Sequence, residues 1–255
     1  MDNVQGLKEN IPNESIDVTV TSPPYDNLRD YNGYKLDIEG LIKELYRVTK
    51  QGGVVVWVVG DATVKGSETG TSFRQALTFM EAGFRLHDTM IYEKNSMSMP
   101  DKVRYYQKFE YMFIFSKGKP KTFNPIKDHK ITSKRWSKKI TRYEKDGSIS
   151  ERERSLDNEE YGVRFNIWKY NTGRGFTSKE NLKHPAMFPE KLAEDHIVSW
   201  SNEGDIVLDP FMGSGTTAKA SKLLNRKYIG FEISKEYVQM AEKRVESLEM
   251  ESENK

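Results

Sequence analysis

Short β-branched runs alternate with amphipathic segments along most of this 255-residue chain, and this alternation limits the possible folds more than any other feature. Ile16–Val20 and Val54–Val59 are typical of buried strands, and between them Leu41–Thr49 carries its apolar residues at helical spacing. Strands that alternate with helices are joined by crossovers, which place helices on both faces of a parallel sheet. We therefore predict an α/β fold with a doubly wound, mostly parallel sheet.

Further elements follow the same rhythm on both sides of a central gap. A helix over Ser72–Glu81 is expected to end at Gly83, because glycine disfavours continuation of a helix. We expect further strands at Thr89–Tyr92, Tyr111–Phe115, Asp205–Asp209 and Tyr228–Glu232, and further helices at Pro189–Ser199, from Thr217 to Leu224, and at Glu236–Glu249.

The gap, from about Gly118 to Tyr170, has few aliphatic residues and no clean period. Its first part is strongly basic, because Lys117–Lys145 holds 11 Lys and Arg residues against two acids, a formal charge of +9. Since the whole chain carries only +2, the rest of it carries −7. A segment of this composition is either a solvated insertion or a surface that binds an acidic partner.

Several absences narrow the chemistry that this chain can perform. It contains no cysteine, which excludes disulfides, thiolate zinc sites and a cysteine nucleophile. His87 and His129 have no partners at ligand spacing, so we predict no metal site. No apolar run approaches the roughly 18 residues of a membrane span. No N-terminal segment resembles a secretion signal, so we expect a cytoplasmic protein without a membrane partner.

A glycine-rich turn follows the predicted strand that ends at Asp209. In Asp209–Thr217 the sequence is DPFMGSGTT, where glycine lets the backbone pass close to a ligand and the following helix offers free N–H groups. Neither GxGxxG nor GxxxxGK[ST] is present, which disfavours nicotinamide and P-loop sites. The next strand ends at Glu232, whose carboxylate could accept both hydroxyls of a ribose. The alternative is a structural turn beside a surface glutamate.

A proline-rich loop follows the first predicted strand. Thr21–Tyr25 has the sequence TSPPY, and two successive prolines cannot continue a central strand because they lack N–H donors. Ser22 and the Pro23 carbonyl could accept both hydrogens of an amino group on a planar base, while the base stacks on Tyr25. An ordinary turn is the alternative for this pentapeptide.

Taken together and in this order, Thr21–Tyr25 and Asp209–Thr217 resemble the motifs of the DNA amino-methyltransferases. These enzymes transfer a methyl group from S-adenosylmethionine (SAM) to cytosine N4 or adenine N6, and the motif order is similar to that of their permuted β group. Tyr106–Lys117, His184–Leu192 and Gly204–Glu232 resemble further family motifs, so the resemblance covers nearly all of the chain outside the gap. It implies a Rossmann-like SAM methyltransferase sheet with a basic insertion.

The resemblance also implies a cofactor site. It assigns the methionine and sulfonium end of SAM to Asp209, Phe211, Gly213, Ser214, Gly215 and Thr216, with His184, Pro185 and Phe188 nearby. Glu232 would take the ribose hydroxyls, and Asp2 matches an acid that contacts the adenine amine, although the strand that precedes this acid in the family is missing here. The two loops must then lie side by side at the carboxyl edge of one sheet, so that the methyl donor faces the target amine.

The implied catalytic residues are Ser22, Pro23, Pro24 and Tyr25. A target amine inside a duplex must flip out of the helix to reach them. Methylation of cytosine C5 is excluded, because it requires a cysteine nucleophile. Serine at position 22 resembles the cytosine-N4 enzymes, whereas adenine-N6 enzymes usually carry Asp or Asn there. We therefore expect cytosine N4 and keep adenine N6 as the alternative.

Double-stranded DNA is the expected partner, and the basic gap is its expected contact. The side chains that could neutralise phosphates are Lys134, Arg135, Lys138, Lys139 and Arg142. We expect a catalytic half at 1–117, a target-recognition insertion at 118–170 and a SAM-binding half at 171–255. A cognate restriction endonuclease and a homodimer remain open. Methylation of RNA or of a small molecule is a competing hypothesis, and so is a DNA-binding module without catalytic activity.

Overall fold

The computed structural model describes residues 2–24, 36–95, 102–132, 139–153, 159–171 and 189–253. The chain divides into two compact units. Unit 1 comprises Met1–Asn124 and Asn166–Lys255, and unit 2 comprises Pro125–Phe165. Unit 2 is therefore inserted in the sequence of unit 1, within the range where the rhythm of strands and helices is lost.

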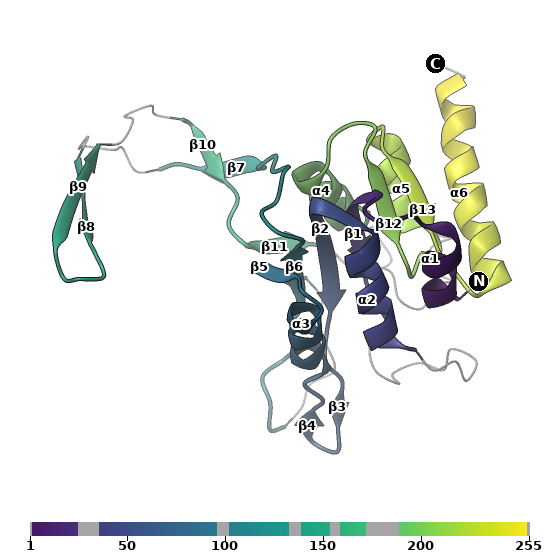
Figure 1. The fold of residues 1–255 in the computed structure, drawn as a ribbon, viewed down its shortest axis with the longest axis horizontal. Coiled ribbons are helices and arrows are strands. Elements are labelled where there is room, and N and C mark those ends of the chain that lie inside the picture. The colour runs from purple at the N-terminus through teal and green to yellow at the C-terminus, as the bar shows by residue number, and fades with distance from the viewer. Residues whose placement is uncertain are drawn as a thin grey trace. The chain divides into compact units, whose positions relative to one another are not determined.

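Unit 1 is built on a seven-stranded sheet in the order β11-β5-β6-β2-β1-β12-β13 (Figure 1). Its strands are β1 (Ile16–Thr21), β2 (Thr49–Val59), β5 (Arg85–Lys94), β6 (Phe109–Ser116), β11 (Ile167–Tyr170), β12 (Ile206–Asp209) and β13 (Lys227–Gly230). Neighbouring strands run parallel except at β6, which is antiparallel to β2 and to β5. The mostly parallel sheet that the sequence predicts is confirmed.

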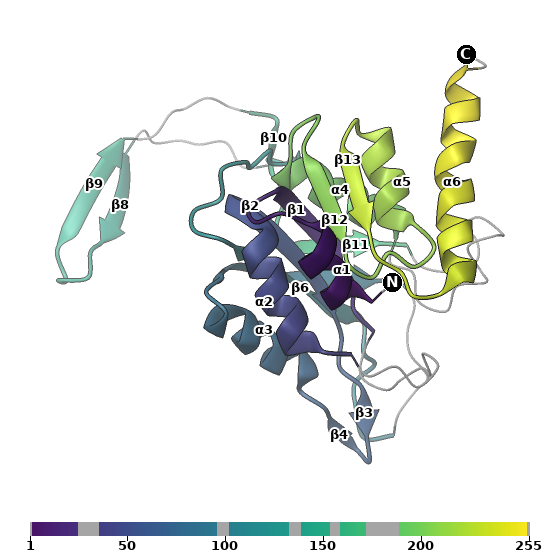
Figure 2. The ribbon, with the colours of Figure 1, turned by 45° about the vertical axis from the view of Figure 1, so that its right-hand side comes forward.

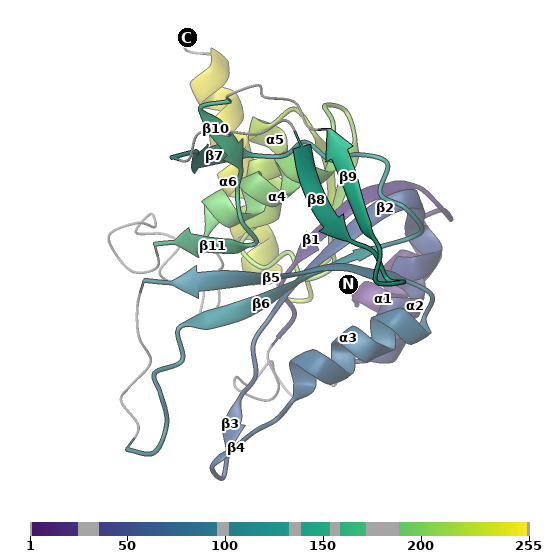
Figure 3. The same ribbon diagram turned by 90° about the vertical axis from the view of Figure 1, so that its left-hand side faces the viewer.

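Helices cover both faces of this sheet. They are α1 (Asn3–Asn10), α2 (Ile38–Val48), α3 (Thr71–Glu81), α4 (Glu190–Trp200), α5 (Thr216–Leu223) and α6 (Lys235–Glu253). The first three share one apolar core with the sheet, to which they contribute Leu7, Leu45 and Phe79. Figure 3 shows α2 and α3 on one side of the sheet and α4 and α5 on the other. A short hairpin of β3 (Thr63–Val64) and β4 (Ser67–Glu68) precedes α3.

Large aromatic side chains fill the space between α3 and the sheet. Trp57 on β2 and Phe115 on β6 both pack against Phe79 of α3, and the stacked rings of Phe79 and Phe115 lie 4.1 Å apart. Trp57 Nε1 donates a hydrogen bond of 2.8 Å to Gln75 Oε1, so its buried polar atom has a partner. Burial of such large apolar surfaces stabilises the fold and fixes α3 on this face.

Four elements of unit 1 escape prediction from the sequence pattern: α1, β11 and the two-residue strands β3 and β4. The helix α1 has too few apolar residues to show a helical period, and burial of Leu7 in the core stabilises it instead. The strand β11 lies where we expect no strand, yet it pairs with β5 and buries Trp168 and Tyr170. A segment of four residues is too short for its period to be recognised. Predicted boundaries also shift: β5 begins at Arg85 rather than Thr89.

Unit 2 consists of paired strands. The strands β7 (Lys127–Lys130) and β10 (Tyr161–Val163) form one antiparallel pair, and β8 (Lys139–Tyr143) and β9 (Ile149–Glu153) form another. No apolar side chain that the structure describes in this unit is buried. Strand pairing and exposed charges therefore take the place of a core. Across the described parts of both units, no helix has the length and hydropathy that a membrane span requires.

Candidate active site

The proline-rich and glycine-rich loops begin at the carboxyl ends of two adjacent parallel strands. In the pairing of β1 with β12, Val18 lies opposite Val207 and Thr19 lies opposite Leu208. At the ends of these strands, Thr21 Oγ1 donates a hydrogen bond of 2.6 Å to Asp209 Oδ1. Figure 2 shows the two strands side by side, between β2 and β13 in the sheet order. The side-by-side placement of the loops that the sequence requires is confirmed.

Asp209 is a buried acid at the centre of this junction, with only 2% of its surface exposed. Its carboxylate accepts hydrogen bonds from the Thr21 hydroxyl, from the Thr217 hydroxyl and from the backbone N–H of Phe211. Burial raises the pKa of Asp209 to about 6, in spite of these hydrogen bonds, and the nearby charge of Glu232 adds to the rise. Because protein groups surround the carboxylate, its geometry suits a role in shaping the loop.

Glycine is required where the loop turns into α5. Gly213 and Gly215 have φ angles of 51° and 85°, in the left-handed region that favours glycine. A Cβ atom on Gly215 would lie 2.8 Å from the Cβ of Ala241 on α6, so this position has no room for a side chain. Gly215 caps α5 without a side-chain hydrogen bond, which leaves the first turn of the helix to bind a ligand through its N–H groups.

Glu232 follows β13 and holds the glycine loop from the other side. Its Oε2 accepts a hydrogen bond of 3.0 Å from the N–H of Gly213, and its Oε1 accepts one of 2.8 Å from the N–H of Ser234. A carboxylate oxygen has two lone pairs, so these backbone contacts are compatible with ribose hydroxyls as further donors. The bare glycine cradle, the uncapped helix and this acid together fit SAM, the cofactor that the resemblance implies.

Three charged side chains from three different helices also hold the glycine loop. Arg244 on α6 donates to the carbonyl of Ser214 at 3.2 Å and to Thr216 Oγ1 at 3.3 Å. The same guanidinium pairs with Glu190 of α4, which also accepts a hydrogen bond of 2.8 Å from Lys219 of α5. The pKa of Glu190 lies below its usual value. Burial alone would raise this pKa, but the positive charges of Lys219 and Arg244 lower it by more. No sequence signal marks this network, because its members lie on separate helices.

The N-terminal helix contacts the same loop. Asp2 caps α1 by accepting a hydrogen bond of 2.9 Å from the N–H of Gln5. Asn3 Nδ2 donates a hydrogen bond of 3.2 Å to the carbonyl of Pro210, which is part of the glycine loop. Asp2 therefore precedes Asn3, the residue that contacts the glycine loop.

The structure describes only part of the predicted site. Pro23 is buried, whereas Ser22 and Pro24 are partly exposed. Phe211 packs on the core, with its ring 6.2 Å from that of Trp57. The predicted residues that lie outside the described ranges are Tyr25, Lys134, Arg135, Lys138, His184, Pro185 and Phe188.

The hairpin of β8 and β9 separates its charges between two faces. Lys139 and Glu151 lie on one face, where Lys139 Nζ and Glu151 Oε2 form an ion pair of 2.9 Å. Arg142 and Arg152 lie on the other face, because side chains alternate along each strand and Ile140 is opposite Arg152. The sequence pattern does not mark Arg152, since its neighbours Glu151 and Glu153 hide its charge in the composition of the segment.

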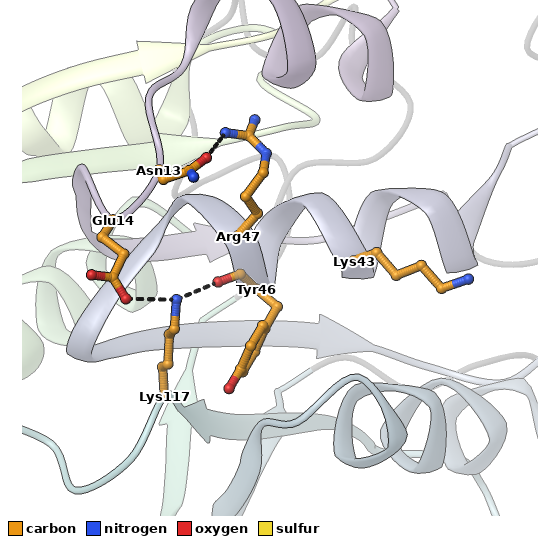
Figure 4. Close-up of a pocket in the computed structure, with 6 residues that line it drawn as sticks. All are labelled: Asn13, Glu14, Lys43, Tyr46, Arg47 and Lys117. Carbon is orange, nitrogen blue, oxygen red and sulfur yellow. Dashed lines mark hydrogen bonds and ion pairs between the residues drawn. The ribbon is translucent and has the colours of Figure 1, made fainter.

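A pocket of about 460 Å³ lies at the opposite edge of the sheet, before β1 and after β6 (Figure 4). Lys117 Nζ lies 3.1 Å from Glu14 Oε1 and donates to the carbonyl of Tyr46 at 2.9 Å, and Arg47 donates to Asn13 at 2.6 Å. Lys117 and Arg47 are therefore already bonded to groups of the protein. We interpret the pocket as a structural junction. Among the described residues, no cluster of side chains could hold a metal ion.

Comparisons with known proteins agree with this geometry. A family model described as DNA methylase, with N6 and N4 in its name, matches residues 16–243. The orphan methyltransferase M.BamHII of Bacillus amyloliquefaciens is 62% identical over 94% of this chain and 92% of its own length. The type II methyltransferase M.HpaI of Haemophilus parainfluenzae is 29% identical over 96% of this chain and 72% of its own length.

Solved structures share the fold. The SAM complex of M1.HpyAVI is 29% identical, with a TM-score of 0.62 over 96% of both chains. The PvuII DNA methyltransferase, named cytosine-N4-specific, has a TM-score of 0.69 over 96% of this chain and 84% of its own, at 24% identity.

Proposed function

Since this chain belongs to the N6/N4 family of DNA methylases and is a SAM-dependent DNA methyltransferase, we propose that its target is the N4 amine of cytosine in double-stranded DNA. The contact between Thr21 and Asp209 supports methyl transfer at this junction, because it joins the loop that would hold the base to the loop that would hold the cofactor. Serine at position 22 favours cytosine, and adenine N6 is the alternative.

Ser22 and Pro23 would prepare the target amine for reaction. The lone pair of an exocyclic amine is delocalised into the ring, which makes the nitrogen a poor nucleophile. The Ser22 hydroxyl and the Pro23 carbonyl would accept its two N–H groups, favour a pyramidal nitrogen and aim the lone pair at the cofactor. SAM supplies an electrophilic methyl group when bound. Methylation makes the nitrogen strongly acidic, so the reaction needs no strong base.

The glycine loop would hold the cofactor in line with that amine. We assign the ribose hydroxyls to Glu232 and the methionine end to the loop from Phe211 to Thr216. Asp209 acts through the loop, because its oxygens accept hydrogen bonds from Thr21, Thr217 and Phe211. His184, Pro185 and Phe188 keep the supporting roles that the resemblance implies.

Unit 2 would hold the DNA while the target base leaves the duplex. Flipping costs a few kcal/mol, and contacts with the backbone must offset this cost. Tyr25 would replace the stacking that the flipped base gives up, and the basic residues Lys139 and Arg142 would contact phosphates. We propose that Pro125–Phe165, the part of the expected insertion at 118–170 that forms unit 2, recognises the target, and that residues 1–117 and 171–255 form the two halves of the catalytic domain, with β11 completing its sheet.

Mass spectrometry of nucleosides distinguishes the two target bases. Plasmid from a host that lacks its own DNA methylation is treated with the protein and SAM, then digested to nucleosides. N4-methylcytosine supports the proposal, and N6-methyladenine replaces it with the alternative. DNA binding without either product supports an inactive module, and transfer only to RNA or a small molecule overturns the assignment of DNA. The variant Asp209→Ala, treated in the same way, controls for methylation by the host.

Whether a cognate restriction endonuclease accompanies this methyltransferase is a separate question from the target base. The 62% identical relative is named an orphan methyltransferase, which argues against a cognate endonuclease for this chain. Two of the more distant relatives are named type II methyltransferases. Cleavage of unmethylated but not methylated plasmid by an extract of the native host would reveal such a partner.

A further inference from the structure

The C-terminal helix α6 backs the glycine loop. It packs beside α5, and Figure 2 shows the two helices next to each other. Met212 of the loop forms one apolar cluster with Ala241 and Val245 of α6. Gly215 comes so close to α6 that a Cβ atom there would meet Ala241. Arg244 follows Ala241 by three residues, so both side chains lie on the same face of the helix. The loop therefore lies against one face of α6.

Arg244 is the charged residue of this face, and only 11% of its side chain is exposed. One terminal nitrogen, Nη1, donates to the Ser214 carbonyl at 3.2 Å and to Thr216 Oγ1 at 3.3 Å. The other, Nη2, donates to Glu190 Oε1. Ser214 and Thr216 are themselves buried. The guanidinium therefore joins the turn that starts α5 to the first residue of α4, at a place that is largely closed to water.

Glu190 fixes the direction of this guanidinium. Its other oxygen, Oε2, accepts a hydrogen bond of 2.8 Å from Lys219 Nζ, so each oxygen of the carboxylate has a cation as its partner. The pKa of Glu190 lies below its usual value, and the carboxylate is therefore charged at neutral pH. A charged partner holds Nη2 more firmly than a neutral one would, which keeps Nη1 directed at the loop.

We propose that Arg244 is a positioning residue for methyl transfer, which fixes the Ser214 carbonyl and the Thr216 hydroxyl and so aims the first N–H groups of α5 at the methionine end of SAM. These N–H groups can hold a ligand in line only if the turn that carries them keeps one geometry. Gly213 and Gly215 would otherwise let the turn relax, because glycine has access to many backbone conformations. This role rests on the proposed function, in which the glycine loop holds SAM, but it does not depend on the target base.

Two replacements of Arg244 separate its charge from its two terminal nitrogens. Arg244→Gln removes the charge, and Arg244→Lys keeps it but offers one nitrogen in place of two, so it cannot hold the loop and Glu190 equally well. Calorimetry should show SAM binding weakened about tenfold in Arg244→Gln and several-fold in Arg244→Lys, with unchanged DNA affinity in both. Lys243→Gln is the matched control, because Lys243 is exposed on the same helix, and it should bind SAM as the wild type does. Wild-type SAM affinity in either Arg244 variant overturns the proposal.

Hydrogen exchange of the protein without SAM tests the same role where no cofactor takes part. The amides of residues 213–217 should exchange about tenfold faster in Arg244→Gln than in the wild type, whereas those of β2 in the middle of the sheet should be unchanged. Unchanged exchange in the loop contradicts the proposal. Faster exchange throughout unit 1 also contradicts it, because Arg244 would then stabilise the whole fold rather than position the loop.

Glu190 should act through Arg244. Glu190→Gln keeps the shape of the side chain but loses its charge, and it should weaken SAM binding about threefold. The double variant Arg244→Gln, Glu190→Gln should bind SAM as weakly as Arg244→Gln alone, because groups in one network are not additive. Losses that multiply contradict the proposal. Tighter SAM binding by Glu190→Gln also contradicts it, because net positive charge rather than geometry would then favour the cofactor.

The variant Asp209→Ala distinguishes failure of this role from failure of the cofactor assignment. If Asp209→Ala loses SAM affinity and Arg244→Gln does not, the loop holds SAM but Arg244 does not position it. If both variants bind SAM as the wild type does, the glycine loop is not the SAM site, and both the assignment and the role of Arg244 are overturned. Loss of SAM affinity in both variants, with fast exchange confined to the loop of Arg244→Gln, supports both.

Discussion

Unit 1 and unit 2 hold their geometry by different forces. Unit 1 buries aromatic and aliphatic side chains between helices and sheet, and its site junction contains Asp209, an acid that is almost fully enclosed. Unit 2 has no buried apolar side chain among those described, and its ion pairs, such as Lys127 with Glu159, lie at the surface. Exposed ion pairs contribute only about 0–1 kcal/mol each and are screened by salt.

This difference suits the two units to different tasks, unit 1 to positioning the reacting groups and unit 2 to binding DNA. A buried network keeps its geometry at any ionic strength, as the positioning of a reacting amine requires. An exposed set of charges exchanges protein partners for phosphates at little cost, as binding to DNA requires. Substitutions in unit 1 should therefore change cofactor binding or turnover, and substitutions in unit 2 should change DNA affinity and its salt dependence.

The largest expected effect is the pH dependence of stability that Asp209 causes. Its pKa is about 6 in the folded protein against an ordinary value of 3.8, so the folded state binds the proton more tightly. Stability is then fully present below pH 4 and is lost as pH rises through about 6, by about 3 kcal/mol. Urea unfolding of wild type and Asp209→Asn should show the wild type losing stability relative to the variant over this range. If the difference in unfolding free energy between the two proteins stays constant with pH, the raised pKa of Asp209 is contradicted.

Removal of the same carboxylate should disrupt the cofactor site. Asp209→Ala leaves Thr21 without its acceptor and frees the N–H of Phe211, so the two loops lose their junction. The Thr217 hydroxyl loses Asp209 as a partner but keeps the carbonyl of Val20 as an acceptor at 3.2 Å. We expect SAM affinity to fall about 100-fold, since each unpaired buried group costs about 1–3 kcal/mol. Calorimetry with SAM measures this loss, and DNA affinity should stay unchanged. Unaltered SAM affinity would show that the loops are held by other contacts.

Tyr25→Ala should separate turnover from cofactor binding. Stacking of a base on an aromatic ring contributes about 1–3 kcal/mol, and only the target base receives it. We expect kcat to fall about tenfold or more, with SAM affinity close to that of wild type. Steady-state kinetics and calorimetry on the same preparation give the two values, and Tyr25→Phe should retain most of the activity. An equal loss of turnover and SAM affinity would refute the stacking role.

The smallest expected effect belongs to the hairpin of unit 2. Arg142→Ala and Arg152→Ala, which share one face of the hairpin, should each weaken DNA binding several-fold and lower its salt slope by about 0.9 for each phosphate that is no longer neutralised. Lys139→Ala on the other face should have a smaller effect, because Lys139 must leave its ion pair with Glu151 before it contacts a phosphate. Fluorescence anisotropy at several salt concentrations measures the slopes. If Arg142→Ala changes SAM affinity and leaves DNA affinity unchanged, the assignment of DNA binding to unit 2 is contradicted.

Local sequence patterns determined most of unit 1. The apolar runs at Ile16–Val20 and Val54–Val59 predicted strands, and the turns after Thr21 and Asp209 predicted where a ligand could approach. These features depend on near neighbours along the chain, such as alternation along a strand or glycine at a positive φ angle. They can therefore be recognised without knowing what the segment packs against.

Only the tertiary structure decided which distant groups meet. The hydrogen bond between Thr21 and Asp209 depends on the order of strands in the sheet, and Arg244 reaches Glu190 because three helices pack around one loop. The short elements α1 and β11 form because the core buries Leu7 and Trp168, although neither segment has a strong period of its own. Contacts of this kind are set by packing between remote segments, and no local pattern of residues records them.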